Sequence, residues 1–134
     1  MTDSIERIDL TTNYLLPIQK VVCCIPNPEH VKWMFRSSAT PQGHFDVAGR
    51  DEKFIIEAYR AGRAISTQQL LGVNFKKTQL INCQLAALSE VNDVLLSIDY
   101  VDSSFVVVRS KFPQITKSIS SAIRSLQRPA GDAG

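Results

Sequence analysis

Four side chains in the first half of the chain are of the kinds that bind soft metal ions: Cys23, Cys24, His30 and His44. The two adjacent cysteines are followed by a histidine after five residues and by a second after thirteen more. Structural zinc sites instead separate their paired ligands by about two to four residues. Adjacent residues of a strand also point to opposite faces, so two neighbouring cysteines in a strand could not reach one ion. The sequence therefore predicts no metal site and no cofactor.

Acid–base or nucleophilic catalysis would depend on the same two histidines. Neither lies in a recognisable signature such as G-x-S-x-G, and the phosphate-binding pattern G-x-G does not occur. Glu29 and His30 are typical of a solvated pair in the first turn of a helix. Asp99 and Asp102 are paired carboxylates at a strand end, where turn formation explains them. We predict no catalytic residue, and an enzyme that uses His30 or His44 is the least favoured class.

Basic and acidic residues are separated along the chain. Residues 58–89 contain four bases and no acid, and residues 103–131 contain five bases and no acid. Such stretches could neutralise the phosphates of RNA or DNA, or bind an acidic partner. A solvated helix face explains the same pattern, and the net charge of +2 is small. The candidate residues for this patch are Arg60, Arg63, Lys76, Lys77, Lys117, Arg124 and Arg128.

Trp33 is the other candidate interaction residue. The stretch 28–37 opens with a proline and is predicted as a short helix. Val31, Met34 and Phe35 share one face of that helix, so Trp33 points away from them and could anchor a partner. The alternative is that the helix is covered on two sides and that this aromatic ring belongs to the core.

The element around which the chain is organised is a predicted β-hairpin. Residues 94–101 alternate with period two, and residues 105–108 are aromatic or β-branched. The intervening residues lack glycine, so we predict a four-residue loop, 102–105, built on a type I turn. Both faces are partly apolar, which indicates a larger sheet with cover on each side. The loop predicts three cross-strand pairs: Tyr100 with Val107, Val101 with Val106, and Ile98 with Arg109.

The clearest helix is predicted from Pro113 to about Gln127. Its apolar residues recur at helical spacing and form a narrow stripe, while serines and bases fill the other face. The stripe consists of Ile115, Ile119, Ala122, Ile123 and Leu126.

Four further segments give weaker signals. Residues 20–25 form an apolar run between two prolines and predict a buried strand. Residues 51–63 favour a helix over a hairpin that pairs 44–47 with 54–56. Residues 66–71 predict one helical turn stopped by Gly72. Residues 78–91 favour a helix, with a strand over 77–85 as the alternative.

Together these elements predict an α+β fold. An antiparallel sheet centred on a hairpin at about 93–111 is packed by the C-terminal amphipathic helix and by two or three further helices. We predict a single domain over 1–134, with a short polar N-terminal arm (1–13) and a short C-terminal tail (129–134). The predicted core is Val22, Cys24, Val31, Phe35, Phe54, Ala58, Ile81, Leu85, Leu96, Ile98, Val107, Ile115, Ile119 and Ile123.

The composition also indicates the compartment in which the protein acts. The three cysteines are odd in number and two are adjacent, which is no disulfide framework and fits a reducing compartment. The acidic first residues are unlike a signal peptide, and no stretch reaches the ~20 apolar residues of a membrane span. We expect a cytoplasmic protein that acts as a non-enzymatic assembly or protein–protein interaction module and self-associates. The alternative is a nucleic-acid binder that uses the basic patch.

Overall fold

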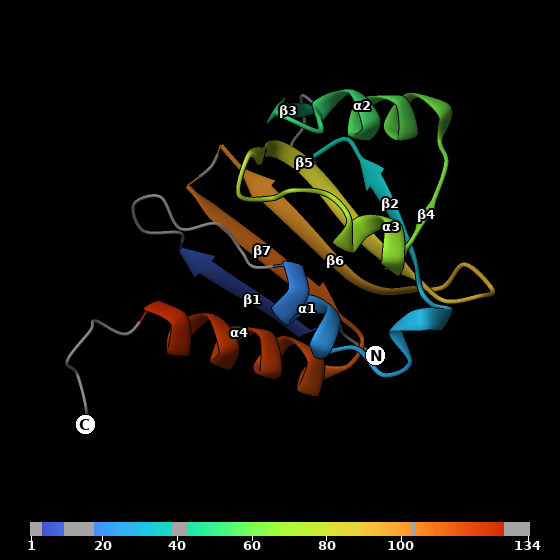
Figure 1. The fold of residues 1–134 in the computed structure, drawn as a ribbon. Helices are drawn as coiled ribbons and strands as arrows, with labels where there is room; N and C mark the ends of the chain where they lie inside the picture. The colour runs from blue at the N-terminus through green and yellow to red at the C-terminus, as the bar shows by residue number, and fades with distance from the viewer. Residues whose placement is uncertain (1–3, 10–17, 39–42, 103, 128–134) are drawn as a thin grey trace.

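The computed structural model describes residues 4–9, 18–38, 43–102 and 104–127. It confirms the predicted α+β fold (Figure 1). In these ranges, no helix is long and apolar enough to cross a membrane. The strands are β1 (Ser4–Asp9), β2 (Lys32–Arg36), β3 (Asp46–Gly49), β4 (Ile65–Ser66), β5 (Thr78–Leu88), β6 (Val94–Val101) and β7 (Phe105–Ser110). The helices are α1 (Ile18–Cys23), the short 3₁₀ helix η1 (Pro28–His30), α2 (Glu52–Ala61), α3 (Thr67–Leu71) and α4 (Pro113–Gln127).

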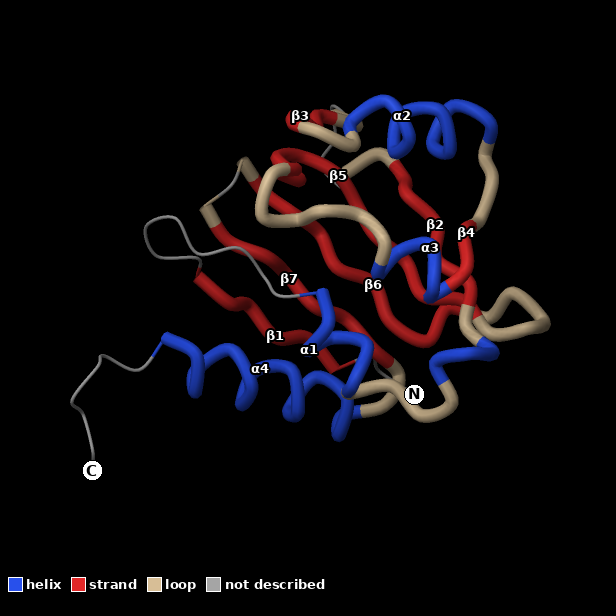
Figure 2. The backbone as a smooth tube through the Cα atoms, in the orientation of Figure 1, coloured by secondary structure: helices blue, strands red, loops and turns tan. Residues whose placement is uncertain are grey.

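The strands form an antiparallel sheet in the order β1-β7-β6-β5-β2-β4, and β3 also pairs with β5 (Figure 2). The first strand of the chain therefore lies at one edge, next to the last strand. Part of the segment predicted as a polar arm, residues 4–9, forms this edge strand.

β5 pairs with three other strands and so connects the two halves of the sheet. One of its edges pairs with β6, and its other edge is shared by β3, which pairs with residues 78–82, and β2, which pairs with residues 84–88. At the end of β3 the backbone of Gly49 adopts φ +124, and a Cβ there would collide with the carbonyl oxygen of Lys77. Only glycine allows this approach of the two strands.

The two faces of the sheet differ in what covers them. Residues directly opposed in antiparallel strands point to the same face. On one face, Phe35, Leu85, Ile98 and Val108 are opposed in a row, and they join one core cluster with residues of all four α-helices. We call the opposite side the open face, because no described helix packs on it. Its rows are Met34, Ala86, Ser97, Arg109 and Ile5, and Arg36, Gln84, Asp99 and Val107.

The expectation of cover on each side of the hairpin is therefore wrong for the described part of the chain. The hairpin itself, β6 and β7, is confirmed, but its predicted pairing is off by one residue. Tyr100 pairs with Val106, Val101 with Phe105, and Ile98 with Val108. Asp102 adopts a left-handed conformation, φ 51, without being glycine, and this allows a three-residue loop in place of the predicted four.

The strand predicted over 20–25 is wrong, because residues 18–23 form α1. Ile18, Val21 and Val22 are the buried residues of this helix, and their spacing is that of one helical face. A short apolar run between prolines cannot distinguish a buried strand from a buried helix by periodicity. Length and β-branched content favoured the strand, but packing on the sheet selected the helix.

The helix predicted over 28–37 is also wrong. The proline opens only the 3₁₀ turn η1, and residues 32–36 then form β2. Burial alternates along β2, with Trp33 and Phe35 buried and their neighbours half-buried. The apolar Met34 between these two aromatic residues hid the alternation in the sequence.

Residues 78–88 form β5, so the favoured helix is wrong here and the alternative strand is the better prediction. The pairing with β3 shifts between Asp46 and Val47, which oppose Asn82 and Leu80. Ile81 is left as the extra residue of a bulge. The bulge breaks the period of two and produced the helix-like spacing of Ile81, Leu85 and Leu88.

Three predicted helices are confirmed. α2 follows Asp51 and ends at Gly62, whose left-handed backbone (φ 60) closes the last turn. α3 begins with a capping box in which Ser66 and Gln69 exchange hydrogen bonds. α4 spans the predicted 113–127 and buries Ile115 and Ile119.

Most of the predicted core is confirmed. Cys24, Phe54, Ile81 and Val107 are instead half-buried, and the side chain of Ile123 lies outside the described part. Val107 lies on the open face, and Ile81 is the bulge residue. The confirmed core residues are Val22, Val31, Phe35, Ala58, Leu85, Leu96, Ile98, Ile115 and Ile119.

Candidate functional site

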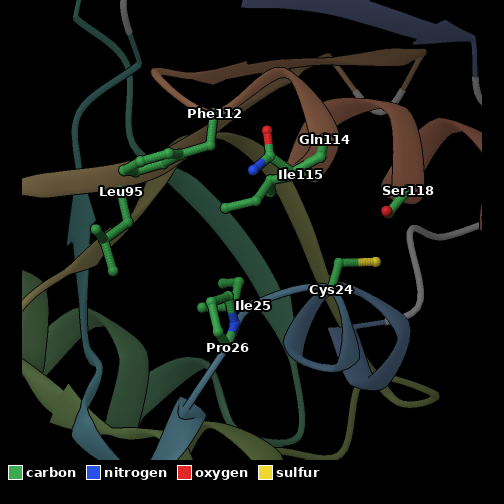
Figure 3. Close-up of a pocket in the computed structure, with 8 residues that line it drawn as sticks. All are labelled: Cys24, Ile25, Pro26, Leu95, Phe112, Gln114, Ile115 and Ser118. Carbon is green, nitrogen blue, oxygen red and sulfur yellow. The ribbon is translucent and has the colours of Figure 1, made fainter.

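An apolar pocket of about 340 Å³ lies where the end of α1, the start of β6 and the start of α4 meet. Leu95 and Phe112 are on one side of it, Cys24 and Ser118 on the other (Figure 3). A volume of this order, lined by apolar groups with a few polar ones, is typical of binding sites. The lining residues are Cys24, Ile25, Pro26, Leu95, Phe112, Gln114, Ile115 and Ser118.

Local hydrogen bonds fix the wall formed by Leu95 and Phe112. The Ser110 hydroxyl donates to the Leu95 carbonyl oxygen at 2.7 Å and accepts from the Phe112 backbone N–H at 3.0 Å. The backbone N–H of Ile115 then donates to the Phe112 carbonyl oxygen at 2.9 Å as α4 begins. Leu95 is also the extra residue of a bulge, since Ala87 opposes Leu96 and Leu88 opposes Val94. The pocket is therefore preformed by the β6, β7 and α4 backbone.

Cys24 supplies the pocket with a thiol that stays protonated. Burial, and then the neighbouring Cys23 thiol, raise the pKa of Cys24 above its ordinary value. Its Sγ–H donates to the carbonyl oxygen of Lys20 at 3.2 Å. Since the thiolate is the nucleophile in cysteine chemistry, this environment suits packing better than catalysis. Cys23, one residue away, is exposed.

The charges along the α4 side of the pocket are basic. Among the residues next in sequence to a lining residue, the charged ones are Lys111 and Lys117, and both are exposed. Lys117 follows Gln114 by one helical turn, so the two lie on the same side of α4. The apolar pocket thus has a positive border along the start of α4.

The connection between β5 and β6, residues 89–93, lies beside the pocket, and we call it the tip. The Ser89 N–H donates to the Asp93 carbonyl oxygen at 2.8 Å, and the Asn92 N–H donates to the Ser89 carbonyl oxygen at 2.9 Å. Asn92 adopts a left-handed φ of 67, and its side-chain oxygen accepts from Lys32 Nζ at 2.7 Å. The tip is therefore tied both within itself and to β2.

The tip presents an apolar side chain between two acids. Val91 is 76% exposed, the largest value among the exposed large apolar side chains of the described residues. Glu90 and Asp93 flank it and are exposed too. His30 Nδ1 lies 3.0 Å from Glu90 Oε1, a contact of two exposed side chains that adds little stability.

The open face carries a third arrangement of polar groups. The Asp99 carboxylate is only 5% exposed, and Arg109 Nη1 donates to its Oδ2 at 2.7 Å. Gln84 Nε2 donates to its Oδ1 at 3.3 Å. At the margin of this face Ile5 is 61% exposed. The network occupies the middle of a sheet surface that no described helix covers.

The structure does not bring the predicted interaction residues together. Arg60 and Arg63 lie at the C-terminal end of α2, whereas the backbone of Lys77 bonds to Arg50 before that helix begins. Lys117 and Arg124 lie on α4, which packs on β1 and β7 at the other edge of the sheet. Arg128 lies outside the described residues, and Lys76 is exposed beside Lys77.

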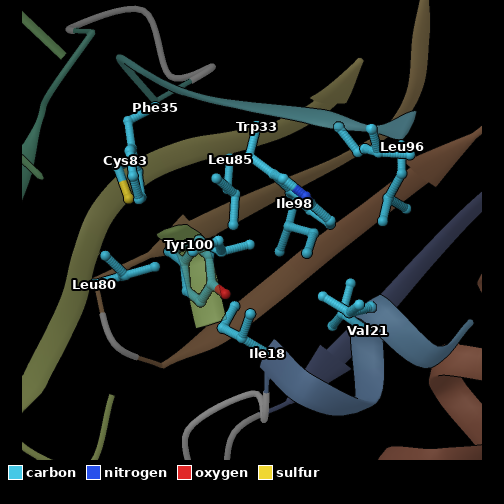
Figure 4. Packing of buried hydrophobic residues seen from close by; sticks show 14 of the residues in the cluster. Ile18, Val21, Trp33, Phe35, Leu80, Cys83, Leu85, Leu96, Ile98 and Tyr100 are labelled. Atoms are coloured by element: carbon cyan, nitrogen blue, oxygen red, sulfur yellow. The ribbon is translucent and has the colours of Figure 1, made fainter. Parts of the chain in front are cut away.

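Trp33 is fully buried in the core and does not lie at the surface (Figure 4). Its Nε1–H donates to Thr67 Oγ1 at 2.8 Å, and the Thr67 hydroxyl donates to the Pro28 carbonyl oxygen at 2.6 Å. The indole thus fastens β2 to α3 and η1. The alternative prediction, that this ring belongs to the core, is confirmed.

The candidate metal and catalytic residues are dispersed. His44 lies in the connection between β2 and β3, and its carbonyl oxygen accepts from Ser38 N–H at 2.7 Å. His30 lies in η1, next to the tip, and its ring contacts the carboxylates of Glu29 and Glu90. Within the described residues, no three His, Cys, Asp or Glu side chains are grouped so as to hold a metal ion.

The pocket and the tip were missed by the sequence analysis. The pocket is formed from three segments far apart in the chain, and no local sequence pattern predicts it. The tip did leave a signal: Val91 is a β-branched apolar residue placed between Glu90 and Asn92 in a turn. A single exposed valine is common at protein surfaces, so this signal alone does not identify a contact.

Comparison with known proteins gives no match, neither to a protein-family model, nor to a curated protein, nor to a solved structure.

Proposed function

We propose that the protein is a non-enzymatic interaction module that associates with further copies of itself. The observation that supports this proposal is the gathering of apolar surface at one end of the molecule. There the apolar pocket lies beside exposed Val91, and Phe112 at its wall is 41% exposed. Apolar surface of this kind, bordered by charged residues, is typical of protein–protein contacts.

The size of this surface indicates a reversible association. Stable dimers bury ~800 Å² on each partner. The proposed contact uses one loop and one pocket on each copy, the kind of small interface that is typical of transient complexes. The expected affinity is therefore in the micromolar range, about −8 kcal/mol.

The test is sedimentation velocity on the full chain from about 1 to 100 µM, a range that spans such an affinity. We expect the weight-average mass to rise with concentration from the monomer toward a dimer. Light scattering coupled to gel filtration at the upper concentration provides an independent mass. A protein that stays monomeric at every concentration would refute the proposal.

A further inference from the structure

We infer that the tip of one copy docks into the apolar pocket of a second copy, and that the second copy returns the same contact. This inference rests on the proposed self-association and specifies its surface. The donor element is the tip, residues 89–93, with Val91 at its centre. The acceptor is the pocket between α1, β6 and α4.

Shape and apolar character support the match. Val91 projects from a turn held by backbone hydrogen bonds, so docking it costs little conformational entropy. The pocket of about 340 Å³ is large enough for the isopropyl group and is lined mainly by apolar side chains. Docking removes from water a valine side chain that is 76% exposed in the single copy, which favours the contact.

Charge selects the same pairing. The valine is flanked by Glu90 and Asp93, which outnumber Lys32 at Asn92, so the tip is acidic. The pocket is flanked by Lys111 and Lys117, and all four flanking residues are exposed. An acidic tip approaching a basic border is attracted at long range and is held in one orientation at contact. Two tips, or two pocket borders, would instead repel one another.

The placement of donor and acceptor favours a closed dimer. Pro26 and Leu95 line the pocket and also line the open hollow at the base of the tip, together with Val91 and Glu90. The two elements are therefore neighbours on one end of the molecule. A two-fold rotation that seats one tip in the partner's pocket also seats the partner's tip in the first pocket. Such an interface is closed, so the assembly stops at two copies.

The native cysteines allow a direct test by cross-linking. In a Cys23→Ser background, Val91→Cys places a thiol on the tip, and half-buried Cys24 is already in the pocket. Because burial raises the pKa of Cys24, the reaction is run at alkaline pH. A short bis-maleimide should join the two thiols between molecules and give a covalent dimer on a denaturing gel. Buried Cys83 is protected from the reagent. The matched control is Ala61→Cys in the same background, an exposed position at the end of α2.

A cross-linked dimer from Val91→Cys that the Ala61→Cys control does not give supports the inference. Equal cross-linking of both variants, or none, overturns it. If the unmodified chain still dimerises in the centrifuge, the proposed function stands and only the docking mode is wrong. If the chain is monomeric throughout, the proposed function itself has failed.

Charge exchange provides a second test that does not depend on cysteine chemistry. Glu90→Lys with Asp93→Lys should weaken dimerisation at least about tenfold, and so should Lys111→Glu with Lys117→Glu. An equimolar mixture of the two double variants should associate again, because each then supplies the charge the other lacks. All four positions are exposed, so the melting temperatures should stay close to that of the parent. Failure of the mixture to associate, or variants that dimerise like the parent, would contradict the docking mode.

Discussion

Two residues on opposite faces of the sheet reach similar burial by different routes. On β6, Ile98 and Asp99 are adjacent residues that point to opposite faces, and both are buried. Ile98 is covered by another layer, the helices of the core cluster. Asp99 is covered from within its own layer, by the side chains that surround it on the open face. A strand with buried residues on both sides therefore need not lie between two layers.

The difference has a chemical consequence. A face sealed by helices excludes water and accepts apolar groups, whereas a face shielded only by long polar side chains can keep a carboxylate if a cation accompanies it. Arg109 is that cation, and its own side chain is 40% exposed. A charge introduced on the covered face should thus strongly destabilise the protein. On the open face, the loss of this one arginine should have the larger effect on stability.

The largest effect is expected on the covered face. Ile119→Asp places a carboxylate without a partner on the helix side of the core, where Ile119 is 1% exposed. We expect a loss of at least about 4 kcal/mol, enough to unfold a typical domain. Ile5→Asp on the open face is the matched control and should change stability by less than ~0.5 kcal/mol. Urea denaturation followed by circular dichroism measures both, and equal effects would abolish the distinction between the faces.

A smaller effect is expected from the cation of the open face. Arg109→Met removes the cation from the nearly buried Asp99 carboxylate, whose Oδ1 still accepts from the neutral amide of Gln84. Because Arg109 is partly solvated, we expect a loss of about 1–2 kcal/mol rather than that of a fully buried pair. Arg36→Met, on the same face, should cost at most ~0.5 kcal/mol. If the two variants melt alike, the Asp99–Arg109 pair does not stabilise this face.

A modest gain in stability is expected from a change within the covered face. The Tyr100 hydroxyl is buried near Ile18 and has no hydrogen-bond partner among the described residues (Figure 4). Tyr100→Phe removes a polar group that lost its solvation on folding, and should stabilise the protein by about 1 kcal/mol. Val106→Ala, the cross-strand neighbour, serves as a control and should destabilise by a cavity instead. A lower melting temperature for Tyr100→Phe would contradict the expected gain.

The smallest effect at neutral pH is expected at Cys83, opposite Tyr100 on the covered face. Burial, and then the carboxylates of Asp99 and Asp46, raise the pKa of Cys83 from 9.0 to about 12. The folded state therefore holds this proton more tightly than the unfolded state. The associated stability is complete below pH 9 and is lost as pH rises toward 12.

Two measurements check this prediction. At pH 8 an aromatic disulfide reagent should modify exposed Cys23 and leave Cys83 untouched until the protein is unfolded. Between pH 9 and 11 the parent should lose more stability than Cys83→Ala. Rapid labelling of Cys83 in the folded protein would show that the covered face is not sealed.

Elements defined by local signals were predictable from the sequence. α4 is indicated by a regular apolar stripe between two prolines, α3 by the glycine that ends it, and the hairpin by alternation in β6. In each case the residues that form the element also carry the pattern that predicts it. The α+β class follows from these elements alone.

Elements defined by distant partners were not predictable. The run in α1 and the aromatic pair in β2 are compatible with either secondary structure, and only their place on the sheet decides between them. β5 carries two register shifts, at Ile81 and opposite Leu95, which destroy its period. The pocket could not be predicted for the same reason, because Cys24, Leu95 and Ile115 come together only in the folded protein. Trp33 became a candidate interaction residue only because a helix was predicted where β2 lies.

The position of β1 has a consequence for how the chain is made. Among the described strands β1 pairs only with β7, and Ser4 opposes Ser110, so its partner emerges from the ribosome more than one hundred residues later. At 5–20 residues per second the first strand waits about 5–20 s for that partner. During synthesis the strands from β2 to β6 can pair in order, while the N-terminal strand remains single. The sheet is then completed only after β7 has been synthesised.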